Sequence, residues 1–97
     1  MSFHSRYDAH ILTTIGLILR HQGRIEESLN NFQSALCLNP MNINNLKQVG
    51  RSLYLLGKHK TALEAFDEAE QLNSEDREIW HNKGDLLTHG MPSHLPH

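Results

Sequence analysis

The stretch that decides the fold is residues 43–76, which read INNLKQVGRSLYLLGKHKTALEAFDEAEQLNSED. The 34 residues before it, 9–42, read AHILTTIGLILRHQGRIEESLNNFQSALCLNPMN and align with it without any insertion. Nine of the 34 aligned positions are identical, among them two glycines, a phenylalanine and an alanine. A fixed period of this length is the signature of a repeat architecture. We therefore predict that the chain is an array of similar units.

The same period continues into a third, shorter copy. Trp80, Gly84 and Leu87 stand 34 residues after a leucine, a glycine and a leucine of the second copy. The last eight residues contain two prolines and show no helical pattern. We therefore expect an N-terminal lead-in over 1–8, a repeat domain over 9–89 with units 9–42, 43–76 and a partial 77–89, and an irregular or disordered tail over 90–97.

Within each unit the apolar residues recur at three- and four-residue steps, which is the spacing of an amphipathic helix. Each full unit accommodates two such helices, and no stretch shows the alternation typical of a strand. The chain is therefore predicted to be all-α. The helices are expected at residues 6–21, 24–38, 42–56, 59–72 and 75–89.

Glycine and proline mark where these helices end. Gly23 and Gly57 lie between the two helices of a unit, where a residue that tolerates positive φ lets the chain turn back. Pro40 ends the first unit because it lacks an N–H and disfavours helix at the residue before it. Ser74 stands at the same position of the second unit and is expected to cap the helix that follows.

The remaining repeated positions predict the packing inside each unit. Gly16 and Gly50 remove a side chain where Ser28 and Ala62 are expected to approach, so the paired helices can lie close together. Trp80 is expected in the core because it aligns with buried-type leucines. The repeat-defining structural positions are Gly16, Gly23, Phe32, Ala35, Pro40, Gly50, Gly57, Ala62, Phe66, Ala69, Trp80 and Gly84.

Composition excludes several classes of function. The formal charge is −2, so the chain as a whole has no electrostatic attraction to a phosphate backbone. Nucleic acid is therefore not an expected partner. The longest apolar run, within residues 15–19, is far below the ~20 residues of a membrane span. The N-terminus lacks the apolar stretch of a signal peptide, and the single cysteine, Cys37, is expected to be a reduced thiol on the packing side of a helix in a cytoplasmic protein.

The pattern resembles the tetratricopeptide repeat. That family has an aromatic residue or Leu early in the first helix, Gly four residues later, a small residue, Phe and Ala in the second helix, and Pro at the end. Residues 9–90 match this scheme, with Ser28 in place of the usual Ala and Ser74 in place of the usual Pro. The resemblance implies helical hairpins stacked as a short right-handed solenoid of about two and a half repeats, acting as a protein-binding scaffold.

A second resemblance is more specific. Residues 45–60, NLKQVGRSLYLLGKHK, and 68–73, EAEQLN, are similar to the family of the fourth Bardet-Biedl syndrome protein, a BBSome subunit. Several of these residues, such as 58–60, are not required by the repeat fold. The resemblance implies a fragment of an adaptor for ciliary membrane-protein trafficking. It also implies BBSome subunits or peptide segments as partners and a location at the cilium, basal body or centriolar satellites.

Repeat arrays of this kind bind partners on the concave surface that the first helices of successive units form. In the first unit that surface is expected to carry His10, Thr13, Thr14 and Leu17. The candidate partner-binding residues are Lys47, Gln48, Arg51, Tyr54, His81, Asn82 and Asp85. Residues 41–61 carry four positive charges and no acid, whereas residues 62–78 have a net charge of −6. Either Lys47 and Arg51 receive an acidic partner segment, or both charged stretches are ordinary solvated helix faces.

Other readings have weaker support. The chaperone-binding subclass of tetratricopeptide repeats binds a carboxylate through positively charged side chains at set repeat positions. Here the corresponding positions are occupied by Thr13, Leu17, Glu78 and Asn82, so the cations are missing. The chain has no glycine-rich phosphate loop or metalloprotease helix motif, so it is not expected to be an enzyme or to need a cofactor.

Two further features leave alternatives open. His81, Asp85 and His89 have a spacing that would suit a metal, but three polar residues so spaced are also common on solvated helices, and we expect no metal site. Ile11, Leu17 and Ile18 give the first helix apolar residues around its circumference. One alternative function is therefore a self-assembling structural fragment without a peptide ligand, which associates through its repeat ends. Another, which the repeat resemblance implies, is a general peptide-binding adaptor of the tetratricopeptide type.

Overall fold

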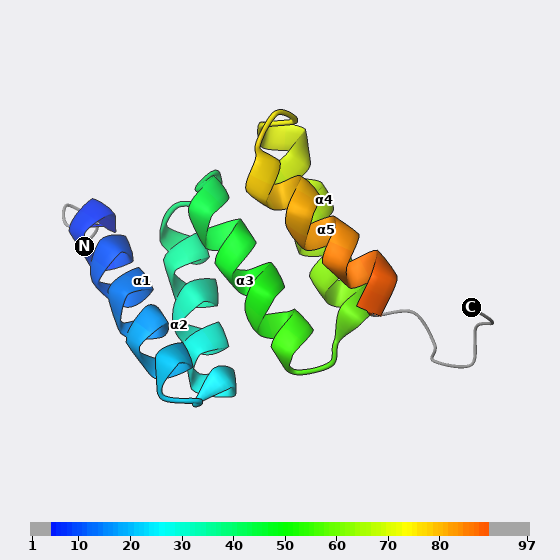
Figure 1. The fold of residues 1–97 in the computed structure, drawn as a ribbon. Coiled ribbons are helices and arrows are strands. Elements are labelled where there is room, and N and C mark those ends of the chain that lie inside the picture. The colour runs from blue at the N-terminus through cyan, green and yellow to red at the C-terminus, as the bar shows by residue number, and fades with distance from the viewer. Residues whose placement is uncertain (1–4, 90–97) are drawn as a thin grey trace.

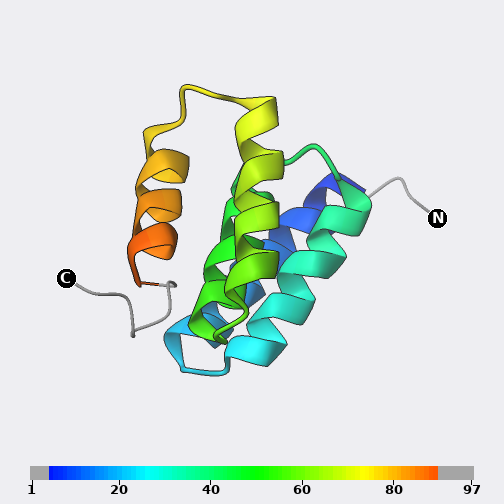
Figure 2. The same ribbon diagram turned by 90° about the vertical axis from the view of Figure 1, so that its right-hand side faces the viewer.

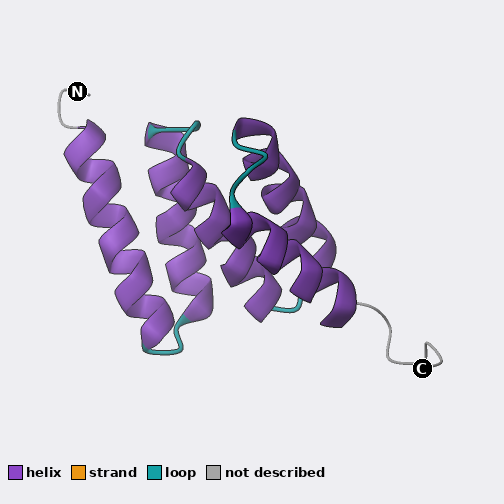
Figure 3. Cartoon of the chain, turned by 45° about the horizontal axis from the view of Figure 1, so that its top comes forward, coloured by secondary structure: helices purple, strands orange, loops and turns teal. Residues whose placement is uncertain are grey.

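The computed structural model describes residues 5–89, and these residues form five α-helices joined by short turns (Figure 1). The described part of the chain contains no strand (Figure 3), so the all-α prediction is confirmed. Every predicted helix bound agrees within two residues, and the first helix already begins inside the expected lead-in. The expected tail, 90–97, lies outside the described residues. The helices are α1 (Ser5–His21), α2 (Ile25–Leu38), α3 (Ile43–Leu55), α4 (His59–Leu72) and α5 (Arg77–His89).

The helices stack as hairpins in chain order. α1 and α2 form one antiparallel hairpin, and α3 and α4 form a second that packs on it through the contact between α2 and α3. α5 packs mainly on α4 and less on α3, so it closes one end of the stack (Figure 2). This arrangement is the array of helical hairpins that the period of 34 residues predicts.

The turns inside the hairpins depend on two glycines. Gly23 and Gly57 have φ of +85° and +82°, a conformation that side chains other than glycine rarely adopt. After the first turn, the Arg24 N–H donates to the Leu19 carbonyl at 2.9 Å, so a carbonyl at the end of α1 is satisfied. The predicted role of both glycines is confirmed.

The glycine in the first helix of each hairpin lies against a phenylalanine ring of the second helix. A Cβ built on Gly16 would lie 2.6 Å from the ring of Phe32, and one built on Gly50 would lie 2.6 Å from the ring of Phe66. Each glycine therefore makes room for a phenylalanine ring. The expected approach of Ser28 and Ala62 to these glycines stays a prediction, and both residues are fully buried.

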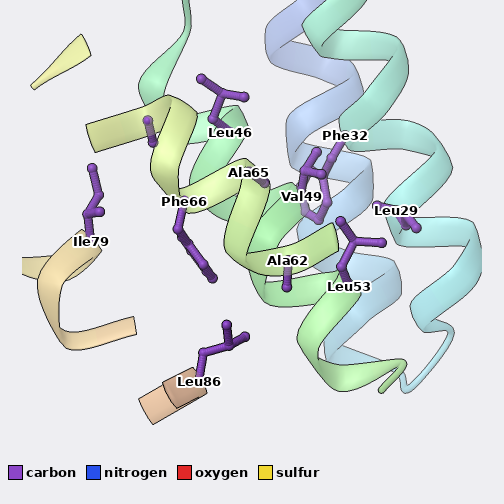
Figure 4. Close-up of a cluster of buried hydrophobic side chains, with 11 residues drawn as sticks. Leu29, Phe32, Leu46, Val49, Leu53, Ala62, Ala65, Phe66, Ile79 and Leu86 are labelled. Carbon is purple, nitrogen blue, oxygen red and sulfur yellow. The ribbon is translucent and has the colours of Figure 1, made fainter. Parts of the chain in front are cut away.

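These phenylalanines form the centre of the core (Figure 4). Phe32 and Phe66 are 0% and 1% exposed, and the alanines three residues later, Ala35 and Ala69, are fully buried. α5 contributes two residues of the cluster. Its members are Leu29, Phe32, Leu46, Val49, Leu53, Ala62, Ala65, Phe66, Ala69, Ile79 and Leu86.

Two predicted core residues lie on the surface. Trp80 is 56% exposed, although the aligned Leu46 is only 4% exposed. The difference arises because α4 covers Leu46, whereas no described helix follows α5 to cover Trp80. Cys37 is also exposed, since it lies near the end of α2 on the side turned away from the core. Both predictions of burial are wrong.

The start of α5 is capped by a residue that the sequence analysis did not select. The Asp76 carboxylate accepts hydrogen bonds from the backbone N–H groups of Glu78 at 2.9 Å and Ile79 at 3.3 Å. Asp76 is therefore the N-cap, two residues after Ser74, which was expected in that role. The added negative charge also suits the positive end of a helix.

Candidate protein-interaction groove

The seven candidate partner-binding residues come from α3 and α5, and the fold brings four of them around one hollow. Arg51 and Tyr54 of α3 face Asn82 and Asp85 of α5 across a hollow of about 100 Å³. Leu55 and Phe66 supply apolar lining, while the carboxylate and the guanidinium give it charges of both signs. Tyr54 is half-buried, and its ring lies 5.2 Å from that of His59.

Asn82 stands out within this hollow. The residue is only 8% exposed, and its amide nitrogen is buried without a hydrogen-bond partner among residues 5–89. Leaving a buried donor unpaired costs about 1–3 kcal/mol, so such groups are rarely unpaired without a reason. A bound acceptor, such as a carbonyl or carboxylate oxygen, would remove that cost.

Lys47 does not present a free charge to this surface. Its ammonium pairs with Asp76 at 3.0 Å and Glu78 at 2.6 Å, and its side chain is 12% exposed. Burial opposes the charge, but the hydrogen bonds to Glu78 and Asp76 outweigh it, so the pKa of Lys47 is raised. Lys47 therefore joins α3 to the start of α5, and Arg51 is the more accessible cation of the pair.

Arg20 of α1 contacts one of the candidate residues of α3, and the sequence did not single it out. Its guanidinium donates a hydrogen bond to the Gln48 side chain and lies 5.3 Å from the centre of the Phe32 ring. Burial, together with the nearby charge of Arg51, lowers the pKa of Arg20. Its repeat position could have indicated it, because Arg20 aligns with the candidate residue Tyr54.

The candidates at the outer edge of the groove are less constrained. His81 is exposed and lies 3.5 Å from the Asp85 carboxylate, one turn away on α5. In the first unit, Leu17 is 40% exposed, and the Thr13 hydroxyl donates to the Asn45 side chain at 2.7 Å. Thr13 therefore holds α1 against α3.

The described residues contain neither a metal-binding cluster nor a membrane-spanning helix. No group of three His, Cys, Asp or Glu side chains within residues 5–89 is arranged to hold a metal ion. The side chain of His89, one of the three residues considered for a metal, lies outside what the structure describes. None of the described helices has the length and apolar character needed to cross a bilayer.

The stacked hairpins, their glycine turns and the phenylalanine that covers each packing glycine define a helical-repeat protein. Residues 9–41 match the family Tetratricopeptide repeat, and the five described helices have an all-α helical-repeat fold.

More specific relatives are BBSome subunits. The chain is 59% identical over 68 residues to BBSome complex member BBS4 of Xenopus tropicalis and 53% identical over 73 residues to that of Mus musculus. It is 47% identical over 73 residues to the homolog of Drosophila melanogaster. The aligned residues are 70–75% of this chain but only 13–15% of these relatives, so the chain matches a short segment of them. Both resemblances read from the sequence are confirmed.

Proposed function

We propose that the chain is a non-catalytic protein-interaction scaffold that binds a segment of a partner protein in the groove between α3 and α5. The observation that carries this proposal is the unpaired, buried amide nitrogen of Asn82 in the wall of the hollow. The proposal needs no bond-making chemistry, because the groove acts by shape, hydrogen bonding and charge.

The lining defines the kind of side chain that the hollow accepts. Asn82 offers a hydrogen-bond donor and Arg51 a positive charge, whereas Tyr54, Leu55 and Phe66 supply an apolar wall. An acidic or amide side chain meets both requirements, since its oxygen accepts from Asn82 and Arg51 while its methylene groups contact the apolar wall. Asp85 disfavours a second acidic group beside it.

The partners we propose are subunits of the BBSome, in an adaptor for ciliary membrane-protein trafficking. Support comes from the 47–59% identity to BBSome members over most of this chain. The proposed location is accordingly the cytoplasm at the cilium, basal body or centriolar satellites.

Affinity capture from a lysate of ciliated cells tests both parts of the proposal. The bait is the chain itself, compared with Arg51→Glu and with Lys60→Glu, an equal change of charge at an exposed position outside the hollow. We expect the parent and Lys60→Glu to recover BBSome subunits and Arg51→Glu to recover at least tenfold less, with equal helicity by circular dichroism. Equal recovery by all three would contradict the groove, and recovery of none would contradict BBSome binding.

A structural role by self-assembly is the second candidate. The observation that favours it is apolar surface at both ends of the stack, where Ile11, Ile18, Trp80 and Leu87 are each more than 50% exposed. Exposed apolar patches of this kind promote association between copies. Here the chain would work as a building block without a peptide ligand.

A further inference from the structure

Arg20 of α1 has a buried donor that the rest of the described structure leaves unpaired. Within residues 5–89, the buried side-chain atoms without a hydrogen-bond partner are both nitrogens, the amide nitrogen of Asn82 and Nη1 of Arg20. Asn82 belongs to the hollow between α3 and α5, whereas Arg20 is not among the residues that line it. Buried polar groups in proteins are rarely unpaired without a reason. The hollow therefore does not explain the unpaired nitrogen of Arg20.

Two contacts hold the Arg20 guanidinium in place. Its Nη2 donates a hydrogen bond to the Gln48 side chain, and its central carbon lies 5.3 Å from the centre of the Phe32 ring, within the range of a cation–π contact. Arg20 is only partly buried, so one side of it faces solvent. These contacts leave Nη1, which carries two N–H groups, for another acceptor.

Arg51 places a second positive charge near Arg20. It follows Gln48 by three residues, so these two side chains lie on the same side of α3. Burial and, next to it, the charge of Arg51 lower the pKa of Arg20, while Glu78 acts in the opposite direction. Neither guanidinium forms an ion pair with a carboxylate of residues 5–89, and Glu78 pairs with Lys47. Two neighbouring cations without a counter-charge favour the binding of an anion.

The donors define the chemistry of that anion. Guanidinium groups are planar and bind oxyanions through paired hydrogen bonds. A phosphorylated side chain has a charge of about −1.5 to −2 and three acceptor oxygens, so it balances two cations, whereas a carboxylate balances one. An anionic membrane suits the chain less well, because such surfaces bind clusters of about four to eight Lys and Arg, and the net charge here is −2.

We propose that Arg20 and Arg51 bind the phosphoryl group of a phosphorylated serine or threonine in the partner segment. Arg20 turns about the last bonds of its side chain, so that Nη1 donates to one phosphoryl oxygen while Arg51 donates to another. The phosphoryl group lies between α1 and α3, whereas Asp85, which would repel it, is on α5. This inference rests on the proposed function, because Arg51 also lines the hollow, and it adds the class of residue that the groove selects.

Nuclear magnetic resonance of the arginine side chains tests the proposal on the 97-residue chain. The probe is the peptide acetyl-Gly-Gly-phosphoserine-Gly-Gly-amide, titrated at neutral pH and constant ionic strength. Matched control peptides carry serine or glutamate at the central position, and inorganic phosphate is titrated separately. We expect the Nε–H signals of Arg20 and Arg51 to shift saturably with the phosphopeptide. Both control peptides should bind at least about tenfold more weakly, because they lack the second negative charge and the third oxygen.

Protein variants locate the binding site. Arg20→Gln and Arg51→Gln each remove one cation and should each weaken phosphopeptide binding at least about tenfold. Arg20→Lys keeps the charge but loses the fork of donors, so it should restore only part of the affinity. Arg77→Gln is the matched control and should bind like the parent, because Arg77 is exposed at the start of α5 and does not line the hollow. Arg51 is also exposed, so Arg51→Gln tests the site even if removing Arg20 from Phe32 lowers stability.

The possible outcomes separate this inference from the proposed function. The phosphoryl site is overturned if no saturable shift occurs, if the glutamate peptide binds as tightly as the phosphopeptide, or if Arg51→Gln binds like the parent. Inorganic phosphate that binds more tightly than the phosphopeptide would overturn a peptide as the source of the phosphoryl group. Capture of BBSome subunits by a chain that does not bind the phosphopeptide would overturn this inference alone. The reverse result would overturn only the proposed partner.

Discussion

Three glycines at the same repeat position have different surroundings, and the difference decides what a methyl group would do there. Gly16 and Gly50 lie against phenylalanine rings that are at most 1% exposed. Gly84 faces open space. In a helix, alanine is favoured over glycine by about 1 kcal/mol when nothing else changes.

We therefore expect opposite effects from one substitution at two of these positions. Gly50→Ala should lower the free energy of unfolding by about 1–2 kcal/mol, because overpacking outweighs the gain in helix propensity. Gly84→Ala should raise it by about 0.5–1 kcal/mol. Urea denaturation followed by circular dichroism measures both, and an equal effect at the two positions would contradict the packing of Phe66 on Gly50.

The ion pair between Lys47 and Asp76 makes stability depend on pH. The hydrogen bond from Lys47 holds the pKa of Asp76 below its usual value of 3.8. A carboxylate of this kind stabilises the fold above that value and loses its contribution as the pH falls through the lower, folded-state pKa. The pKa of Lys47 is raised above 10.5, so its contribution is complete below 10.5 and is lost as the pH rises further.

Lys47→Met isolates this contribution. At neutral pH the variant should unfold with about 1–3 kcal/mol less free energy than the parent, because it leaves two carboxylates without their partner. Below pH 3.8 the difference should shrink, since Asp76 takes up its proton in the unfolded chain before it does so in the folded parent, and the contribution is gone once the pH is below the lowered pKa of the folded state. Urea denaturation at neutral and at acid pH gives the two differences, and a gap that does not change with pH would exclude the ion pair as its source.

Among the helices, α5 depends most on polar links. Lys47 holds its start, and Lys83 pairs with Asp67 and Glu70 of α4, each at 2.7 Å. Those two carboxylates raise the pKa of Lys83. Only one side of α5 is covered, whereas α2 and α3 each pack between two neighbours. Elements with few buried apolar contacts open most easily.

Hydrogen exchange should therefore be fastest in α5 among the five helices. Removing one of its links with Lys83→Gln should speed exchange in α5 further while leaving α1 and α2 unchanged. Mass spectrometry of peptic fragments measures this directly. An equal acceleration along the whole chain would show instead that the described residues open as one cooperative unit.

At the scale of the whole molecule, the two ends of the stack determine association. Ile11 and Ile18 of α1 are 53% and 52% exposed, but their equivalents in α5, Ile79 and Leu86, are buried against the preceding helix. The outer side of α1 therefore has the surface of a helix that normally packs on a neighbour. Such a surface is also where a second copy would bind.

We expect sedimentation equilibrium to show association of the chain that increases with concentration. Ile11→Glu with Ile18→Glu should move the average mass toward that of the monomer. Met41→Glu is the matched control, because Met41 is 67% exposed but lies in the turn between α2 and α3. Monomeric mass for the parent at every concentration would exclude self-assembly through these residues.

The repeat, the five helices and the turn glycines follow from the sequence alone, because they depend on period, propensity and local backbone conformation. The turn at Gly23 depends only on the positive φ of that residue, and each helix can be predicted from a regular spacing of apolar residues. Arg51 and Asn82 could also be selected as groove residues, since helical phase is a local property. Three things could not be derived in this way: the ring over Gly16, the partners of Lys47 and the exposure of Trp80.

These three features were decided by the tertiary structure, because each depends on which side chains the packing of one helix on another brings together. Lys47 and Asp76 are 29 residues apart and meet only when α5 docks. Trp80 has the sequence environment of a core residue, but burial requires a helix on the far side of α5, and the described chain ends at α5. Repetition in sequence predicts equal local structure for each unit, whereas burial is set by what packs against that unit.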